Sequence, residues 1–369
     1  MPSSAPHRRA SPQRPSAVRP RERDSATTIV GADVKRCIYC QGTAIIRQGF
    51  RYKKHETVQL WYCHVCLRTF TPKIAKGKTY PLKVILESLV SYYQGHTRAE
   101  VARQIRSRFG LSLPERTLSG WLAEYRELTT YGRLRDPLAA HFPPRRVIHW
   151  MRLHHQQVYR YGVHRGKLAA ILGGEEHGRF AAVGQYLAEM ASACPHHLFR
   201  ADSRASQDKA VFDLDGVEIR ATYNHACRIA GLVVQSVVHH KRRHDELQRF
   251  MLATDSVTVA VEVPIVLTPE DLGWFKAVFG YRIPLEPDVL LTGHIDVLQV
   301  RNGAVHVLDY KPGANSEKPI TQLMVYTLAL SRRMGIDLFH FVCGWFDEHN
   351  YFEFYPRHVV RRRRVGLGG

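Results

Sequence analysis

Two short segments in the C-terminal third of the chain carry residues of types that do chemistry: Gly-His-Ile-Asp at 293–296 and Leu-Asp-Tyr-Lys at 308–311. Asn302-Gly303 lies between them, and Asn-Gly between two apolar runs is the strongest short-range signal for a two-residue hairpin loop. The spacing therefore predicts that the two segments lie on neighbouring antiparallel strands, with their acidic residues close together.

In the register that this loop sets, Asp296 faces Asp309 and His294 faces Lys311. Directly opposed side chains lie about 5 Å apart, and like charges at that separation destabilise a strand pair. The two carboxylates therefore need a compensating cation, and a divalent metal ion is the natural candidate because hard cations prefer oxygen ligands. Lys311 lies on the same strand face as Asp309, since side chains alternate with a period of two.

The length and composition predict a folded protein with more than one domain. The chain has 369 residues, of which 44% are hydrophobic. No segment reaches the roughly 18 consecutive apolar residues of a membrane helix. The polar, Arg-rich N-terminal stretch also lacks the apolar region of a secretory signal. We therefore expect no membrane partner and a cytoplasmic, nucleoid-associated location.

The charge balance is strongly basic: 53 Lys and Arg residues stand against 33 Asp and Glu residues, for a net charge of +20. An excess of this size is typical of proteins that bind a polyanion, most often nucleic acid. Residues 1–32 are predicted to be a disordered basic arm, and residues 359–369 a basic tail. Charge alone does not distinguish DNA from RNA or from an anionic surface.

Four of the seven cysteines form two C-x2-C pairs, Cys37/Cys40 and Cys63/Cys66. Together they supply the four thiolates of a tetrahedral zinc site, and predicted strands between the pairs make 33–76 a zinc ribbon. A redox role for either pair fits less well, because no βαβ unit surrounds it. The remaining cysteines are expected to be buried small hydrophobic residues: Cys194, Cys227 and Cys343.

Basic and aromatic side chains alternate within the predicted ribbon. Arg51, Lys53 and Lys54 lie close to Phe50 and Tyr52. One interpretation is a solvated basic face around a structural zinc site. The other, which we favour because of the segment that follows, is a contact surface for nucleic acid.

Hydrophobic periodicity becomes helical over 77–130. The first predicted helix spans 81–94, and the second begins at Thr97, where Glu100 three residues later completes a capping box. The third begins at Pro114, after a tight turn. Three short helices in this order predict a helix-turn-helix unit. The Pro- and Arg-containing stretch 131–146 is predicted to be a linker.

A zinc ribbon followed by such a trihelical unit is similar to the N-terminal DNA-binding part of insertion-sequence transposases. The resemblance covers about residues 35–130 and rests mainly on the cysteine spacing. It implies that the helix after Pro114 enters the major groove, with Glu115, Arg116 and Ser119 as candidate DNA contacts. The alternative is that the three helices only pack against their neighbours.

Residues 147–358 are predicted to form a mixed α/β domain. An isolated carboxylate, Glu262, stands within its most apolar predicted strand, so this residue must be paired, protonated or bound to a metal. Four stretches are expected to be helical: 156–173, 180–193, 224–251 and 318–333. Four are expected to be strands: 257–267, 289–300, 304–311 and 338–346.

The order of these elements resembles the RecB-like branch of the PD-(D/E)xK nuclease superfamily. That branch has a carboxylate in its first core strand, then G-x-x-D, D/E-x-K and a helix with Q-x-x-x-Y. The matching residues here are Glu262, Gly293 with Asp296, Asp309 with Lys311, and Gln322 with Tyr326. The resemblance implies a restriction-endonuclease-like core, in which a central mixed sheet is flanked by helices.

The same resemblance implies roles for these residues. Asp296, Asp309 and the main-chain carbonyl of Tyr310 would hold Mg²⁺ or Mn²⁺. Lys311 would orient the attacking water or stabilise developing negative charge, and Gln322 and Tyr326 would position the scissile backbone. The branch also uses a histidine before the first strand, for which His225 and His244 are the candidates and His164 a weaker one.

The sequence also departs from some members of that branch. Iron–sulfur members have three cysteines after the core, whereas here only Cys343 comes late, so no cluster is expected. No G-x-x-x-x-G-K-[ST] loop exists, so no ATP is expected either. The sequence thus predicts a metal-dependent DNA nuclease that its N-terminal module directs. The alternative is a DNA-binding regulator or transposase-like mobile-element protein whose nuclease-like core is not catalytic.

Overall fold

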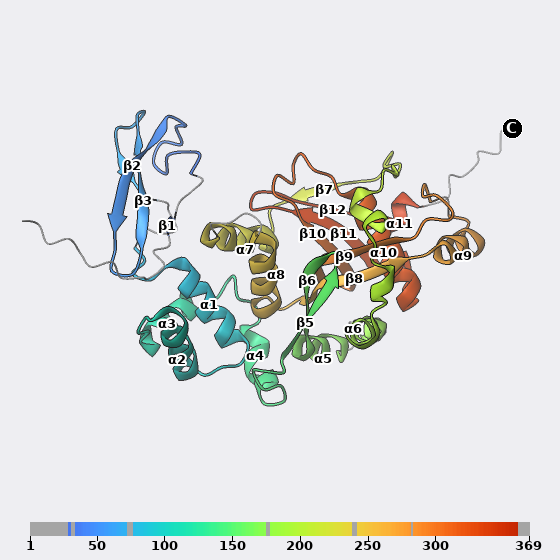
Figure 1. Cartoon of the computed structure of the whole chain (residues 1–369), viewed down its shortest axis with the longest axis horizontal. Coiled ribbons are helices and arrows are strands. Elements are labelled where there is room, and N and C mark those ends of the chain that lie inside the picture. The colour runs from blue at the N-terminus through green and yellow to red at the C-terminus, as the bar shows by residue number, and fades with distance from the viewer. Residues whose placement is uncertain are drawn as a thin grey trace, which may run out of the picture.

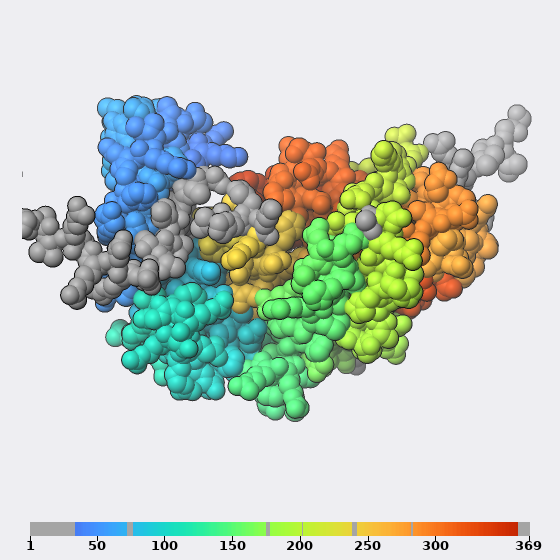
Figure 2. All heavy atoms as spheres, in the orientation of Figure 1, coloured from blue at the N-terminus to red at the C-terminus, as the bar shows by residue number. Residues whose placement is uncertain are grey.

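The computed structural model describes residues 29–30, 34–71, 77–174, 178–237, 242–281 and 283–360. Most of the predicted basic arm and of the basic tail lies outside these residues. In Figure 1 the N-terminal strands stand at one end, the first helices lie beside them, and a large sheet with its helices forms the rest. The space-filling view of Figure 2 shows the same division, with blue and cyan at one end and green to red at the other.

The N-terminal module is a small sheet next to the four paired cysteines. Strands β2 (Ile45–Tyr52) and β3 (Thr57–Cys63) form an antiparallel pair, and β1 (Ile29–Val30) and β4 (Thr69–Phe70) also pair with β3. Among the residues described in this module, the buried hydrophobic cluster consists of Cys37, Trp61, Cys63 and Phe70. A core this small contributes little hydrophobic stabilisation to the module.

Three helices follow, as the periodicity predicted: α1 (Leu82–Tyr93), α2 (Arg98–Phe109) and α3 (Glu115–Glu124). The capping box predicted at the start of α2 is present, with the Thr97 hydroxyl accepting from the Glu100 N–H and the Glu100 carboxylate accepting from the Thr97 N–H. Gly110 ends α2 with a φ of 67°, a left-handed conformation that favours glycine. Both ends of α2 are therefore set by local sequence signals.

The stretch predicted to be a linker, 131–146, is instead packed structure. It contains α4 (Gly132–Ala139), and Tyr131 is only 1% exposed, with its N–H donating to the Thr254 carbonyl. An ion pair between Glu87 of α1 and Arg249 of α8 (Arg243–Thr254) also joins the first helices to the C-terminal domain. One buried hydrophobic cluster runs through both parts, so they share a core rather than being tethered.

The C-terminal domain is built on an eight-stranded sheet with strand order β5-β6-β8-β9-β10-β11-β12-β7. Neighbouring strands are antiparallel except β10 and β11, which run parallel. Its strands are β5 (Ile148–His155), β6 (Gln157–His164), β7 (Arg220–Thr222), β8 (Thr258–Leu267), β9 (Leu291–Arg301), β10 (Ala304–Tyr310), β11 (Phe341–Phe346) and β12 (Tyr351–Phe354).

Helices cover both faces of this sheet and make a three-layer domain (Figure 1). One buried cluster joins the sheet to α6 (Ala181–Ala193) and α10 (Ile320–Met334). The other joins it to α7 (His225–Val233) and α8 (Arg243–Thr254). Three further helices lie at the periphery: α5 (Arg165–Leu172), α9 (Pro269–Phe279) and α11 (Pro356–Val359). The mixed sheet flanked by helices agrees with the predicted core.

The helix predicted over 156–173 is wrong for its first half. Residues 148–164 form the hairpin β5–β6, and only Arg165–Leu172 is helical. The hairpin is held because Gly162 and Val163 pair with β8, a long-range contact that overrides local helical spacing. Two smaller differences concern 224–251, which holds the separate helices α7 and α8, and 338–340, a 3-10 turn before β11.

Candidate active site and cysteine cluster

The hairpin of β9 and β10 has the predicted loop and register. Asn302 and Gly303 have φ angles of 52° and 69°, the left-handed pair that a type I′ turn requires. The facing pairs run from Arg301 with Ala304 to Val297 with Leu308. The next pair would be Asp296 with Asp309, and here the ladder ends.

Beyond Val297 the hairpin opens instead of continuing. The Asp296 Oδ2 accepts a hydrogen bond from the Tyr310 N–H at 2.9 Å, and the Lys311 N–H bonds to the Phe346 carbonyl on β11. The predicted facing of His294 and Lys311 is wrong, because the ladder between β9 and β10 ends at Val297 and Leu308 and His294 is paired with Pro264 of β8. β10 stays paired with β11 up to Tyr310 after it has separated from β9, so Asp296 and Asp309 lie beside one cavity rather than within a strand pair.

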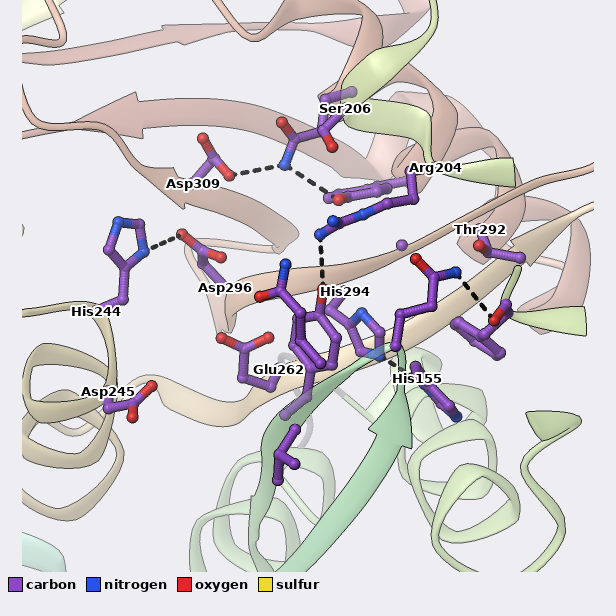
Figure 3. Close-up of a pocket in the computed structure, with 18 of the residues that line it drawn as sticks. His155, Arg204, Ser206, His244, Asp245, Glu262, Thr292, His294, Asp296 and Asp309 are labelled. Atoms are coloured by element: carbon purple, nitrogen blue, oxygen red, sulfur yellow. Dashed lines mark hydrogen bonds and ion pairs between the residues drawn. The ribbon is translucent and has the colours of Figure 1, made fainter. Parts of the chain in front are cut away.

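Asp245 of α8 lines this cavity of about 340 Å³, as do three carboxylates from the sheet: Glu262 of β8, Asp296 of β9 and Asp309 of β10. Figure 3 shows them along one side, each from a different strand of the sheet. Glu262 has a φ of 50°, a left-handed conformation that is costly for a residue with a Cβ and that is typical of functional positions. Lys311, as predicted, also lines the cavity, and its Nζ lies 3.1 Å from the Asp309 Oδ2.

Burial and the nearness of the carboxylates to one another disfavour the ionised forms of Asp309 and Glu262. Burial, reinforced by the nearby Asp296, raises the pKa of Asp309 to about 7, although Lys311 opposes this. Burial and Asp296 likewise raise the pKa of Glu262 to about 8, against a hydrogen bond of 2.8 Å from the Gln248 Nε2. These oxygens are the donor set that a hard divalent cation prefers, so the residues fit such an ion.

Of the three predicted histidines, the structure brings His244 into the site. Its Nδ1 lies 3.4 Å from the Asp296 Oδ2 (Figure 3). Burial opposes protonation of His244, but the hydrogen bond and negative charge of Asp296 outweigh it and raise the pKa of the imidazole. His225 begins α7 away from the cavity lining, and His164 caps α5 by accepting from the Lys167 N–H.

The predicted Gln322 and Tyr326 lie on α10 and reach the site from the opposite layer. The Gln322 Nε2 donates to the Asp309 Oδ1 at 2.9 Å and to the Tyr326 hydroxyl oxygen at 3.1 Å. These contacts fix the orientation of Asp309. Whether the two side chains also position a scissile backbone, as the resemblance implies, remains a prediction.

Sequence reasoning missed two groups around this cavity. Gln248 lies four residues after His244 on the same face of α8, a spacing that was available as a signal. The second group lies on and beside the hairpin β5–β6. Tyr159 stacks on His294 with ring centroids 3.6 Å apart, and the Arg204 guanidinium donates to the Tyr159 hydroxyl at 2.7 Å. This group was hidden because 156–173 was predicted to be helical.

The four paired cysteines form a second site in the N-terminal module. The Sγ atoms of Cys37 and Cys66 are 3.6 Å apart, and those of Cys40 and Cys63 are 3.5 Å apart. In a tetrahedral site with metal–sulfur bonds of about 2.3 Å the sulfurs would be about 3.8 Å apart. All four sulfurs lie within 4.8 Å of one another, so the cluster can hold a metal ion.

The residues predicted to contact DNA differ in their surroundings. Arg51, Lys54 and Arg116 are exposed. Lys53 instead donates from its Nζ to the Glu56 carboxylate at 2.9 Å and to the Lys78 carbonyl at 3.3 Å. Ser119 accepts from the Arg98 guanidinium at 3.1 Å, and Glu115 lies 4.0 Å from the same guanidinium.

Comparison with known proteins places the catalytic candidates within one family model. Residues 165–338 match the PD-(D/E)XK nuclease superfamily, an interval that begins at α5 and contains every residue from Glu262 to Tyr326 named above. The superfamily that the motif order predicted is thereby confirmed for this part of the chain. No curated protein and no solved structure matches the chain. Among the described residues, no helix is long and apolar enough to cross a membrane.

Proposed function

We propose that this chain is a Mg²⁺- or Mn²⁺-dependent deoxyribonuclease of the RecB-like branch. One observation carries the proposal: Glu262, Asp296 and Asp309 come from three adjacent strands to one cavity, with Lys311 beside the last of them. An ion pair that served only stability would need no third carboxylate, and burying uncompensated negative charge is costly. The superfamily match over 165–338 agrees with this assignment.

Asp296 and Asp309 would hold the catalytic ion, together with the Tyr310 carbonyl. When bound, the ion supplies Lewis-acid activation of water and neutralises charge on the attacked phosphate. Gln322 keeps one Asp309 oxygen oriented, which leaves the other facing Lys311. Tyr310 contributes through its backbone, because its N–H already holds Asp296 at 2.9 Å.

Lys311 and His244 supply the positive charge that the reaction needs at two edges of the site. The Lys311 ammonium lies beside Asp309, where it is placed to orient water or to stabilise negative charge that develops on the phosphate. His244 lies beside Asp296 and holds that carboxylate from the α8 side. Gln248, also on α8, donates a hydrogen bond to Glu262, so α8 positions two of the three carboxylates of the sheet.

The N-terminal module would bring this centre to DNA. We propose that Cys37, Cys40, Cys63 and Cys66 hold a structural zinc ion and that the three helices act as a helix-turn-helix. Arg51 and Lys54 are free to meet phosphates at the surface, as is Arg116 on α3. Lys53 would act mainly inside the module, since its ammonium is bound to Glu56.

The test is cleavage by the purified full chain of labelled linear and circular DNA with Mg²⁺, with Mn²⁺ and with EDTA. We expect cleavage only with a metal, and its loss in Asp309→Asn and in Lys311→Ala. Asp288→Asn and Lys318→Ala are matched controls, because both residues are exposed and lie outside the cavity lining. Equal cleavage by Asp309→Asn and the parent chain would remove the assignment.

A further inference from the structure

We propose that His155, Cys194 and His196 form a second transition-metal site, for zinc, beside the catalytic cavity. The three ligand atoms lie within 4.8 Å of one another, and the residues come from three elements. His155 ends β5, Cys194 follows the last residue of α6, and His196 begins the 3-10 turn His196–Leu198. This site is separate from the carboxylates and from the four-cysteine cluster, and it goes beyond the proposed nuclease function.

The geometry is close to that of a metal-bound set. The His155 Nε2 lies 2.7 Å from the His196 Nδ1 and 4.0 Å from the Cys194 Sγ. Around zinc, with bonds of about 2.1 Å to nitrogen and 2.3 Å to sulfur, these separations become roughly 3.4 and 3.6 Å. His196 is exposed, so its ring can make the adjustment of less than 1 Å without disturbing a core. A fourth position is left for solvent.

His155 has the neutral imidazole that binding a metal ion requires. Burial, helped by the neighbouring His196 and His154, lowers the pKa of His155 to about 4, so its imidazole is neutral near pH 7. Burial raises the pKa of Cys194 to about 11, so binding zinc would break its S–H bond and release that proton to solvent.

A hydrogen bond behind the site orients His155. Its Nδ1 lies 2.8 Å from the His294 Nε2, so with zinc on Nε2 the Nδ1–H donates to His294. Phe199 stacks on the His155 ring with centroids 3.8 Å apart, and Tyr159 covers His294. The imidazole is thus held by ring contacts and by a hydrogen bond, as metal-binding histidines usually are.

The position of the site gives it a structural task. His155 lies at the end of β5 next to the hairpin tip, and Gln156 to Tyr159 line the catalytic cavity from that hairpin. His294 lies two residues before Asp296 on β9 (Figure 3). Zinc at His155, Cys194 and His196 would therefore fix the hairpin wall against α6 and against the strand that carries Asp296.

The experiment is a zinc count on the full chain, purified in zinc-containing buffer, dialysed without chelator and measured by plasma mass spectrometry. We expect two zinc ions per chain in the parent and one in His196→Asn. His197→Asn is the matched control, because His197 is the exposed neighbour outside the cluster, and it should keep two. Cys194→Ser should also keep one, and circular dichroism shows that each variant is folded.

A second variant separates this site from the four-cysteine cluster. Cys37→Ser/Cys40→Ser should retain one zinc, with X-ray absorption showing two nitrogens at about 2.0–2.1 Å and one sulfur at about 2.3 Å. One zinc in the parent and none in this double variant would overturn the proposal, as would two zinc ions in folded His196→Asn. These counts need no DNA cleavage, so failure of the nuclease proposal would leave them interpretable.

Discussion

The ring of Tyr326 lies directly against the backbone of Gly293, so that a Cβ added at Gly293 would be 2.4 Å from the Tyr326 Cε1 and 2.6 Å from its hydroxyl oxygen. Real Cβ atoms essentially never approach so closely. The Tyr326 ring therefore occupies the space that a side chain at Gly293 would fill. Tyr326 in turn contacts Gln322, which holds Asp309, so the missing side chain of Gly293 supports the arrangement of the candidate catalytic acids.

Replacing that glycine should damage both stability and activity. In Gly293→Ala the new methyl must displace the Tyr326 ring, and overpacking of this kind costs about 1–3 kcal/mol of unfolding free energy. Because Asp309 loses its oriented partner, we expect DNA cleavage to fall about 100-fold. Urea unfolding and cleavage rates measure the two effects. Gly273→Ala, at an exposed position of α9 where a Cβ meets nothing within 4 Å, should leave both unchanged or slightly raise stability.

The metal-free protein should become less stable as the pH rises from about 5 to 8. Both Glu262 and Asp309 have pKa values in the folded protein, about 8 and about 7, that lie above their unfolded values of about 4. The folded state therefore binds these protons more tightly, so their stabilisation is complete below pH 4 and is lost as the pH rises through 7 to 8. Thermal unfolding across this range, after dialysis without added Mg²⁺ or Mn²⁺, measures the loss.

Two comparisons assign that pH dependence to the acidic cluster. Glu262→Gln resembles the protonated acid, so its melting temperature relative to the parent should rise as the pH increases. Adding Mn²⁺ should restore stability mainly at the upper end of the range, because the ion requires deprotonated carboxylates. A difference between parent and Glu262→Gln that stays constant from pH 5 to 8 would contradict the raised pKa of Glu262.

His244 and His225 were equal candidates by sequence, and the structure now separates them. Of the two, only His244 lies beside one of the candidate catalytic acids, 3.4 Å from the Asp296 Oδ2. His244→Ala should therefore weaken cleavage or metal affinity about 10- to 100-fold, the usual effect of removing a residue that orients a metal ligand. His225→Gln should cleave at the parental rate per folded molecule. Cleavage titrated against Mn²⁺ distinguishes the two variants, and equal loss in both would refute the assignment.

The sequence predicted best those features that short-range signals control. Asn302-Gly303 sets the β9–β10 register through its own left-handed φ angles, and Thr97 with Glu100 starts α2. This register predicted that Asp296 and Asp309 lie close together, because the loop that fixes it is only a few residues from each of them. What it did not predict was the end of the ladder at Val297 and Leu308, beyond which β10 is still paired with β11, some 35 residues later, but no longer with β9.

Features decided by distant contacts were missed. Residues 157–164 form a strand because β8 provides an edge to pair with. The sequence of this segment alone does not predict that pairing. Because that hairpin was not predicted, His155 and Tyr159 were also not recognised as part of the cavity wall. The stretch 131–146 looked like a linker for a similar reason: the burial of Tyr131 depends on Thr254 and the cluster around it.

The final prediction concerns the four-cysteine cluster, which should be needed for DNA binding more than for chemistry. Cys63 is fully buried in a hydrophobic cluster that otherwise contains Cys37, Trp61 and Phe70. Cys63→Ser should therefore release its zinc and unfold the ribbon, because so small a core does not compensate for the lost metal. The C-terminal domain has its own large core, so its thermal transition should persist.

Cleavage and binding assays then separate the two parts. In Cys63→Ser, the unfolded ribbon no longer holds Arg51 and Lys54 in place to contact phosphates, so the affinity for DNA in gel-shift titrations should fall. A plot of log affinity against log salt concentration should become shallower by about one unit of slope per lost contact. At saturating DNA and Mn²⁺ the variant should still cleave, because Glu262, Asp296, Asp309 and Lys311 all lie in the C-terminal domain. Cys37→Ser, Cys40→Ser and Cys66→Ser should have the same effects as Cys63→Ser, since each removes one ligand of the same ion. Ser192→Ala serves as a surface control, and unchanged zinc and DNA affinity in Cys63→Ser would remove the ribbon from the mechanism.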